Sequence, residues 1–160
     1  METEVTSKVL LSNPRASMYP VPVTLVTCTD GDFTNVLTVS WTGIMCSKPP
    51  IVYISVRPER YSFHLLEKNK KFCINIPTTD MLEKVDYCGN VSGNIINKCQ
   101  ECGFSLITLA QSYPKAISEC KHHLFCDVID QLDLGTHSAF IAKVDRKSGS
   151  AGMPRPISYA

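Results

Sequence analysis

The chain has 160 residues, of which 44% are hydrophobic and 19% charged, and 16 basic against 15 acidic side chains give a formal net charge of +1. This length can bury one sizeable core, and no internal repeat or low-complexity tract divides it, so we expect residues 1–160 to form a single domain. The balanced charge, without a basic run interleaved with aromatic residues, argues against a nucleic-acid-binding surface.

The N-terminal residues lack the charged start and long apolar core of a signal peptide. No window approaches the roughly 18 apolar residues that a membrane helix needs, so we expect no membrane partner. These features predict a cytoplasmic protein. Eight cysteines in such a chain are then expected to be reduced thiols rather than a disulfide framework, with Cys28, Cys46 and Cys73 as small buried side chains.

The first third of the chain reads as strands joined by turns. Residues 21–29 are strand-like, and Asp30-Gly31 between two β-branched runs is typical of a hairpin. A strand from Asn35 is then joined by a Pro-Pro loop to a second strand. In the first strand one face carries Asn35, Leu37, Val39 and Trp41, and the other carries Thr38, Ser40 and Thr42. In the second strand Val52, Ile54 and Val56 can face a core, opposite Tyr53, Ser55 and Arg57.

The middle of the chain contains two predicted helices. Residues 60–70 have a helical pattern with Leu65 and Leu66 on the apolar side, and residues 72–76 form a strand stopped by Pro77. Asp80 followed by Glu83 resembles a capping box that opens a helix ending near Gly89. Residues 92–98 are polar and loop-like.

Two further strands, 119–132 and 138–144, are joined by a turn at 132–135. Many strands with few, short helices predict a mainly β protein, and the lack of regular β–α alternation argues against a doubly wound parallel sheet. A closed or half-open barrel hides the edges of so many strands. We therefore expect a β-barrel with peripheral short helices.

The segment from Asn35 to Ser62 gathers an aromatic ring, an amide, hydroxyls and guanidinium groups. Such groups suit a ligand with a flat heterocycle and an anionic tail, which is what flavin mononucleotide (FMN) presents. Ser62 lies near the start of a predicted helix, whose unpaired N–H groups can hold a phosphate, and Arg57 and Arg60 add donors. The alternative is that both arginines are solvated and that Trp41 is a barrel core residue.

The same segment carries a family resemblance. The runs Asn-x-x-Thr-Val-Ser-Trp, Ser-x-Pro-Pro and Ser-Val-Arg-Pro-x-Arg-Tyr-Ser resemble flavin reductase-like, flavoredoxin-type proteins of the FMN-binding split β-barrel superfamily. The resemblance extends from about residue 21 to residue 144. It implies a split barrel of Greek-key type, bound FMN and a homodimer whose interface completes the pocket, with the 92–98 loop as a candidate interface element.

The resemblance also implies roles for individual residues. It places Asn35 and Trp41 at the flavin, phosphate contacts at the turn before Ser62, and His137 beside the flavin ring. Lys98 is kept in the run Ser-Gly-x-x-x-Asn-Lys, although this run has Asn94 and Asn97 where the family often has Arg and Asp. The cofactor-binding candidates are Asn35, Thr38, Ser40, Trp41, Ser55, Val56, Arg57, Tyr61, Ser62, Lys98 and His137. Tyr159 is a weaker candidate, and no catalytic residue or metal ligand is assigned.

The expected function is that of an FMN-binding oxidoreductase. It is either a flavin or metal-ion reductase that uses NAD(P)H, or a flavoredoxin that passes electrons between protein partners. The sequence has no Gly-x-Gly-x-x-Gly fingerprint, so NAD(P)H would have to dock directly against the flavin. The alternatives are a non-catalytic barrel that holds heme or another flat ligand, and a small cysteine-based metal-binding module.

The pair Cys99-x-x-Cys102 admits three interpretations. A structural zinc site needs a second, well-spaced pair. A redox Cys-x-x-Cys needs a thioredoxin-like strand–helix context, which the surrounding residues do not clearly supply. We therefore interpret the pair as thiols on a short helix that ends at Gly103.

Overall fold

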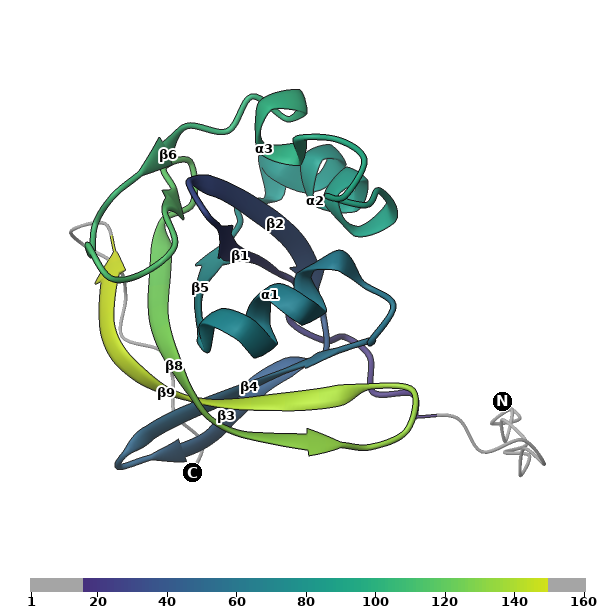
Figure 1. The fold of residues 1–160 in the computed structure, drawn as a ribbon, viewed down its shortest axis with the longest axis vertical. Helices are drawn as coiled ribbons and strands as arrows, with labels where there is room; N and C mark the ends of the chain where they lie inside the picture. The colour runs from purple at the N-terminus through teal and green to yellow at the C-terminus, as the bar shows by residue number, and fades with distance from the viewer. Residues whose placement is uncertain (1–15, 150–160) are drawn as a thin grey trace, which may run out of the picture.

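The computed structural model describes residues 16–149, and Tyr159 lies outside them (Figure 1). Its main element is a seven-stranded antiparallel sheet with the order β2-β1-β5-β8-β9-β4-β3. The strands of this sheet are β1 (Thr24–Asp30), β2 (Phe33–Val39), β3 (Thr42–Ser47), β4 (Pro50–Val56), β5 (Lys71–Ile76), β8 (His122–Asp133) and β9 (Ser138–Gly149). A separate two-stranded ribbon consists of β6 (Leu106–Ile107) and β7 (Ala116–Ile117).

The helices are short and lie around the sheet. They are α1 (Tyr61–Asn69), a 3-10 turn η1 (Thr79–Met81), α2 (Leu82–Asn90) and α3 (Lys98–Glu101). The prediction of a mainly β protein with short peripheral helices is thus confirmed. Within residues 16–149, no helix combines the length and apolar character that crossing a membrane requires.

The two edge strands of the sheet, β2 and β3, are consecutive in the chain and are separated by only Ser40 and Trp41. The predicted continuous strand from Asn35 through Trp41 is therefore wrong, because the chain leaves one edge of the curled sheet at Val39 and enters the other at Thr42. The Trp41 carbonyl already accepts a hydrogen bond from the Ser55 N–H at 2.8 Å, so Trp41 is aligned with β4.

The strand order skips neighbours, as expected for a Greek-key split barrel. After β4 the chain passes through α1 to β5, which lies three positions away in the sheet. The hairpin β8–β9 fills the gap, since β8 pairs with β5 and β9 pairs with β4. Segments far apart in sequence therefore surround one barrel interior.

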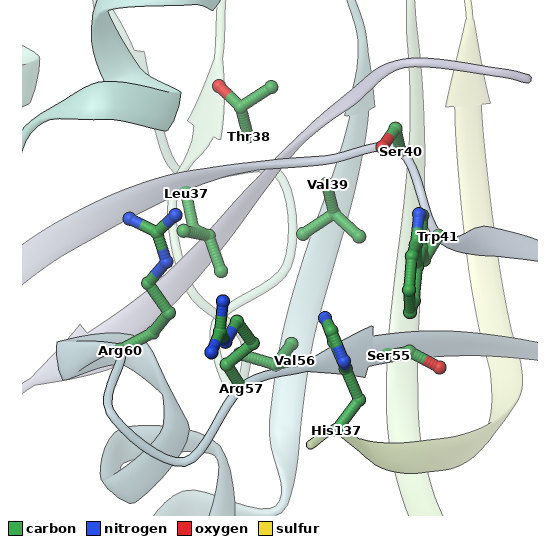
Figure 2. A pocket seen from close by; sticks show the side chains of 10 residues that line it. All are labelled: Leu37, Thr38, Val39, Ser40, Trp41, Ser55, Val56, Arg57, Arg60 and His137. Carbon is green, nitrogen blue, oxygen red and sulfur yellow. The ribbon is translucent and has the colours of Figure 1, made fainter. Parts of the chain in front are cut away.

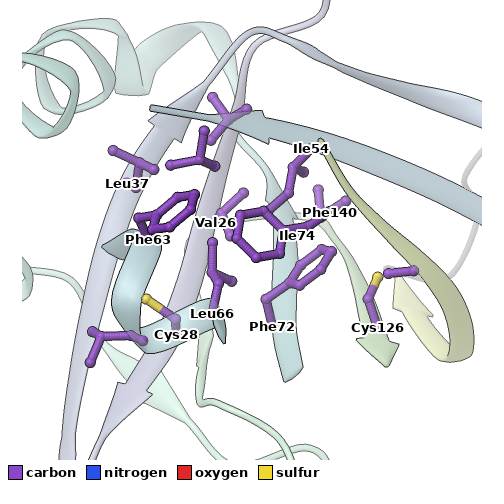
Figure 3. Packing of buried hydrophobic residues seen from close by; sticks show 14 of the residues in the cluster. Val26, Cys28, Leu37, Ile54, Phe63, Leu66, Phe72, Ile74, Cys126 and Phe140 are labelled. Carbon is purple, nitrogen blue, oxygen red and sulfur yellow. The ribbon is translucent and has the colours of Figure 1, made fainter. Parts of the chain in front are cut away.

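The barrel interior is filled by side chains of β1, β2, β4, β5, β8, β9 and α1 (Figure 3). Val52, Ile54 and Val56 face this core, as predicted from their alternation. The Phe63 ring of α1 packs edge-on against Phe140 with a centroid distance of 5.3 Å. Burying such a side chain contributes about 1.5–3 kcal/mol, so α1 is held to the barrel by its apolar face.

A second core lies on the outer side of β1 and β2, under α2 and α3. Here Val36 of β2 packs with Val85 of α2 and Cys99 of α3. Its neighbour Leu37 points into the barrel. Both faces of β2 are therefore covered, which fixes the position of this strand next to the site.

Three local predictions differ from the structure. The proposed capping box at Asp80 and Glu83 is wrong, because Asp80 lies inside η1 and α2 begins after Met81 without a side-chain cap. Cys46 is only half-buried because β3 is an edge strand. The last strand also continues to Gly149, five residues past its predicted end, since β8 pairs with it over its whole length.

Candidate functional site

A cleft of about 160 Å³ opens where the barrel is split, between the end of β2 and the end of β4 (Figure 2). The linker at Ser40 and Trp41 forms one wall, and the turn after β4 forms another. The lining residues are Leu37, Thr38, Val39, Ser40, Trp41, Ser55, Val56, Arg57, Arg60 and His137.

Two aromatic rings stack at one end of the cleft. The rings of Trp41 and His137 lie with centroids 4.1 Å apart at an interplanar angle of 27°. Trp41 is 47% exposed, so the alternative that it fills the barrel core is excluded. Burial, and then the nearby Arg57 guanidinium, lower the pKa of His137 below its ordinary value of 6.5, so the imidazole is neutral at neutral pH.

Two guanidinium groups lie along the cleft beyond these rings (Figure 2). Arg57 forms an exposed ion pair with Glu59, with 3.5 Å between Nε and Oε2. Arg60 is the N-cap residue of α1 and donates from Nη1 to the Gly89 carbonyl at 3.2 Å. Arg60 therefore spans from the start of α1 to the end of α2, and both arginines bring positive charge to the cleft.

A smaller cavity of about 90 Å³ continues the cleft toward the N-terminus of α1. Leu37 and Arg60 line both cavities. The smaller cavity also has the first turn of α1, the 91–93 segment and Lys98 in its wall. Since the first N–H groups of a helix have no partner within the helix, this end of the cleft can hold an anion.

A buried amide supports the wall of the smaller cavity. Asn35 donates from Nδ2 to the Ser62 hydroxyl at 2.7 Å, while its Oδ1 is buried without a hydrogen-bond partner among the described residues. Gly93 packs directly over this oxygen, because a Cβ added at Gly93 would lie 1.9 Å from Asn35 Oδ1. Only glycine allows the 91–93 segment to approach so closely.

Lys98 is the first residue of α3 and is almost fully buried. Its Nζ donates to the Cys88 carbonyl of α2 at 3.0 Å. Burial lowers the pKa of Lys98 below its ordinary value of 10.5. The side chain thus links α3 to α2 and lines the anion-binding end of the cleft.

The structure distributes the predicted cofactor-binding residues over both cavities. The residues that line the larger cavity are Thr38, Ser40, Trp41, Ser55, Val56, Arg57 and His137. Those that line the smaller cavity are Tyr61, Ser62 and Lys98, and Asn35 lies behind Ser62. Besides the contacts of Asn35, Ser62, Arg57 and Lys98 given above, the Thr38 hydroxyl donates to the Val85 carbonyl, and the Tyr61 hydroxyl donates to Asp30.

Seven lining residues were not among the candidates: Leu37, Val39, Glu59, Arg60, Val91, Ser92 and Gly93. Leu37 and Val39 were only placed on the same strand face as Trp41, and Arg60 was noted only as an additional phosphate donor. Gly93 carries no chemistry of its own and was missed. Its position in the run Ser-Gly-x-x-x-Asn-Lys was the signal that a close backbone approach occurs there.

The donors present fit FMN in kind. Trp41 and the neutral His137 offer flat surfaces for a ring, while the start of α1, Arg57, Arg60 and Lys98 offer positive charge for a phosphate. The cleft and the smaller cavity measure about 160 and 90 Å³, and a neighbouring cavity of about 370 Å³ shares Ser40, Trp41 and Ser55 with the cleft. Together they reach the range of roughly 300–1,000 Å³ that ligand pockets occupy.

The curled antiparallel sheet and the cleft at its split define a barrel protein suited to a flat, anionic ligand. The family model described as "Flavin reductase like domain" matches residues 16–160. The chain belongs to this family, and the resemblance drawn from Asn35 to Ser62 is confirmed. Membership supports a flavin-related oxidoreductase function.

Two solved structures have the same fold. The flavoredoxin of Methanosarcina acetivorans is 26% identical with a TM-score of 0.84, covering 91% of this chain and 77% of that one. The flavoredoxin of Desulfovibrio vulgaris (Miyazaki F) is 25% identical with a TM-score of 0.83, covering 93% of this chain and 80% of that one.

Among curated proteins, an uncharacterised protein of Pyrococcus abyssi is 29% identical over 127 residues, which are 79% of this chain and 73% of the relative. The matches span 62% of a relative from Archaeoglobus fulgidus and 48% of one from Aeropyrum pernix. The matched segment therefore spans less than two thirds of the length of these two relatives.

Proposed function

We propose that this protein is an FMN-binding oxidoreductase that exchanges electrons with a partner at the cleft of the split barrel. One observation carries the proposal: the cleft has stacked aromatic rings at one end and the cationic start of α1 at the other. This order of groups matches the order of ring and phosphate in FMN.

The protein's part is to bind and orient the flavin, which supplies the redox chemistry when bound. The N–H groups at the start of α1, the Ser62 hydroxyl and Arg60 would hold the phosphate, with Lys98 adding charge behind them. Trp41 would border the ring. His137, kept neutral by burial, can accept or donate a single hydrogen bond there without adding positive charge.

Purification tests the proposal directly. We expect a yellow protein with flavin absorbance that releases FMN on denaturation. Trp41→Ala should weaken FMN binding while the far-UV circular dichroism stays unchanged, because Trp41 is outside the core. A released heme, a bound metal with no flavin, or an unaltered affinity in the variant would contradict the proposal.

A second experiment identifies the electron donor. Anaerobic mixing of the flavin-loaded protein with NADH or NADPH separates the two possibilities. Rapid bleaching of the flavin absorbance identifies a nicotinamide-dependent reductase. A flavin that bleaches only with a reduced redox protein identifies an electron carrier.

We further propose a homodimer whose second chain completes the cleft. The edge strand β3 leaves Ile44 83% exposed and Met45 half-exposed, and Ile95 is exposed in the 92–98 loop. A partner chain over these side chains would bury apolar surface and close the small cavities around the ligand.

A further inference from the structure

Two cysteines from different helices meet on the outer side of β1 and β2. Cys88 lies near the end of α2, and Cys102 is the C-cap residue of α3. Their sulfur atoms are 3.7 Å apart. A disulfide has an S–S distance of about 2.05 Å, so a small side-chain rotation or a shift of the four-residue helix α3 brings the sulfurs within bonding distance.

The motif pair Cys99 and Cys102 is not the pair that the fold brings together. Cys99 is buried, and its thiol donates to the Thr34 carbonyl of β2 at 3.3 Å. Cys102, three residues later, is directed to Cys88 instead. Cys99 is thus engaged with β2, and the sulfur contact of Cys102 is with a partner 14 residues away in the chain.

The two thiols differ in exposure, which assigns them different parts in an exchange reaction. Cys88 is fully buried, and burial raises its pKa to about 12. Cys102 is partly exposed at the end of α3, before Gly103. An oxidant from solution therefore meets Cys102 first, and Cys88 is the thiol positioned to resolve the product.

We propose that Cys88 and Cys102 form a reversible intramolecular disulfide by reaction with a low-molecular-weight disulfide. The Cys102 thiolate attacks one sulfur of the reagent, forming a mixed disulfide and releasing one reagent thiol. The Cys88 thiol then gives up its proton and displaces the second reagent thiol. The two protein thiols are oxidised by two electrons, and the reagent is reduced to two thiols.

The bridge would close a loop that contains one wall of the smaller cavity. Gly93 and Lys98 both lie between the two cysteines, and Lys98 already bonds to the Cys88 carbonyl. Oxidation would fix α3 to α2 and restrict the 91–97 segment over Asn35. A changed FMN affinity on oxidation is a consequence that rests on the proposed function, whereas formation of the bridge does not.

The test uses the full-length protein, first reduced and then incubated with oxidised glutathione at neutral pH. Free thiols are alkylated, and the digested protein is analysed by mass spectrometry before and after reduction. We expect a pair of peptides cross-linked through Cys88 and Cys102, which reduction of the disulfide separates. Half-buried Cys46, on the distant strand β3, is the internal control and should end as a glutathione adduct rather than a cross-link.

Variants separate this pairing from the motif pairing. Cys102→Ser should abolish the cross-link, and Cys99→Ser should leave it intact. Cys88→Ala should trap glutathione on Cys102. If that buried substitution prevents folding, the two other variants decide alone. Three outcomes would overturn the proposal, whether or not the protein binds FMN. They are a Cys99–Cys102 bridge, a stable glutathione adduct on Cys102 of the unmodified chain, and no reaction at Cys102.

Discussion

Arg57 offers the most direct test of the anionic end of the cleft. If it contacts the FMN phosphate, Arg57→Ala should weaken FMN binding much more than binding of riboflavin, which lacks the phosphate. A charge-assisted contact contributes about 1.5–3 kcal/mol, or about tenfold to a hundredfold in dissociation constant. We expect the lower end of this range because Arg57 is exposed and already paired with Glu59. Titrations followed by flavin fluorescence measure both affinities.

Arg146→Ala provides a matched control, since Arg146 is an exposed arginine in β9 outside both cavities. It should leave both affinities unchanged. The Arg57 effect should also shrink at high salt, because part of it is screened Coulomb attraction. Equal losses for FMN and riboflavin would mean that Arg57 supports the ring end, and the phosphate would then be assigned to Arg60 or Lys98.

His137 should titrate below the ordinary histidine pKa of 6.5, because burial and then Arg57 disfavour its charged form. Between the folded-state pKa and 6.5 the unfolded chain binds a proton that the folded chain does not. The free energy of unfolding should therefore fall as the pH drops through this range. NMR of the imidazole protons against pH measures the pKa.

Two variants test whether Arg57 lowers the His137 pKa and whether His137 causes the loss of stability at low pH. Arg57→Gln should raise the His137 pKa part of the way back, since burial remains. His137→Gln should remove part of the acid sensitivity of stability between pH 6.5 and the folded-state pKa. A His137 pKa at or above 6.5 would show that the ring is more hydrated than its stacking on Trp41 implies.

At the level of elements, the 91–97 segment depends on Gly93. Gly93→Ala should destabilise the protein by about 1–3 kcal/mol and weaken FMN binding, because the added Cβ would lie 1.9 Å from Asn35 Oδ1. Asn94→Ala, in the same segment but exposed and outside both cavities, is the control. Urea unfolding and flavin titration measure the two effects.

A double variant shows whether the contact with Asn35 is the cause. Asn35→Ala removes the clashing oxygen, so Gly93→Ala should cost less in that background than alone. Additive losses in the double variant would argue that the 91–97 segment is disturbed in some other way.

Elements with a strong local signal were predictable from the sequence. The helix predicted over 60–70 is observed as α1 (Tyr61–Asn69), because Leu65 and Leu66 mark its buried side. The thiols on a short helix before Gly103 are likewise observed, with Gly103 at a φ of 61°.

The break at Ser40 and Trp41 was not predictable, because the alternation of β2 continues through it and only the curl of the sheet requires it. The ribbon β6–β7 was missed because two-residue strands leave no periodic pattern.

For the candidate site, the chemistry of the residues predicted which side chains line the cleft, but not which of them are buried. Trp41, Arg57 and His137 were proposed as neighbours, and they line one cavity. Burial was not visible in the sequence: the Lys98 ammonium lies inside the fold, bonded to a carbonyl of another helix. Such bonds depend on where α2 and α3 pack, which no local pattern specifies.

For the whole molecule, we predict a particle of twice the 17.7 kDa of one chain in sedimentation equilibrium. Ile44→Asp with Met45→Asp should shift it toward the monomer and weaken FMN retention, since both are exposed apolar side chains of the proposed interface. Leu82→Asp on α2, which changes an exposed apolar residue away from both cavities, is the control. A monomer that still holds FMN tightly would contradict a shared cleft.

The position of the β8–β9 hairpin also determines when the barrel can close during synthesis. The ribosome produces β1 to β5 first, and these strands can form only the β1–β2 and β3–β4 hairpins and the β1–β5 pair. The free edges of β5 and β4 remain without a partner until residues 122–149 emerge. Open strand edges template association with other chains. A nascent chain that stalls before His122 therefore exposes two such edges, and the β8–β9 hairpin, which is made after them, is the segment that protects them.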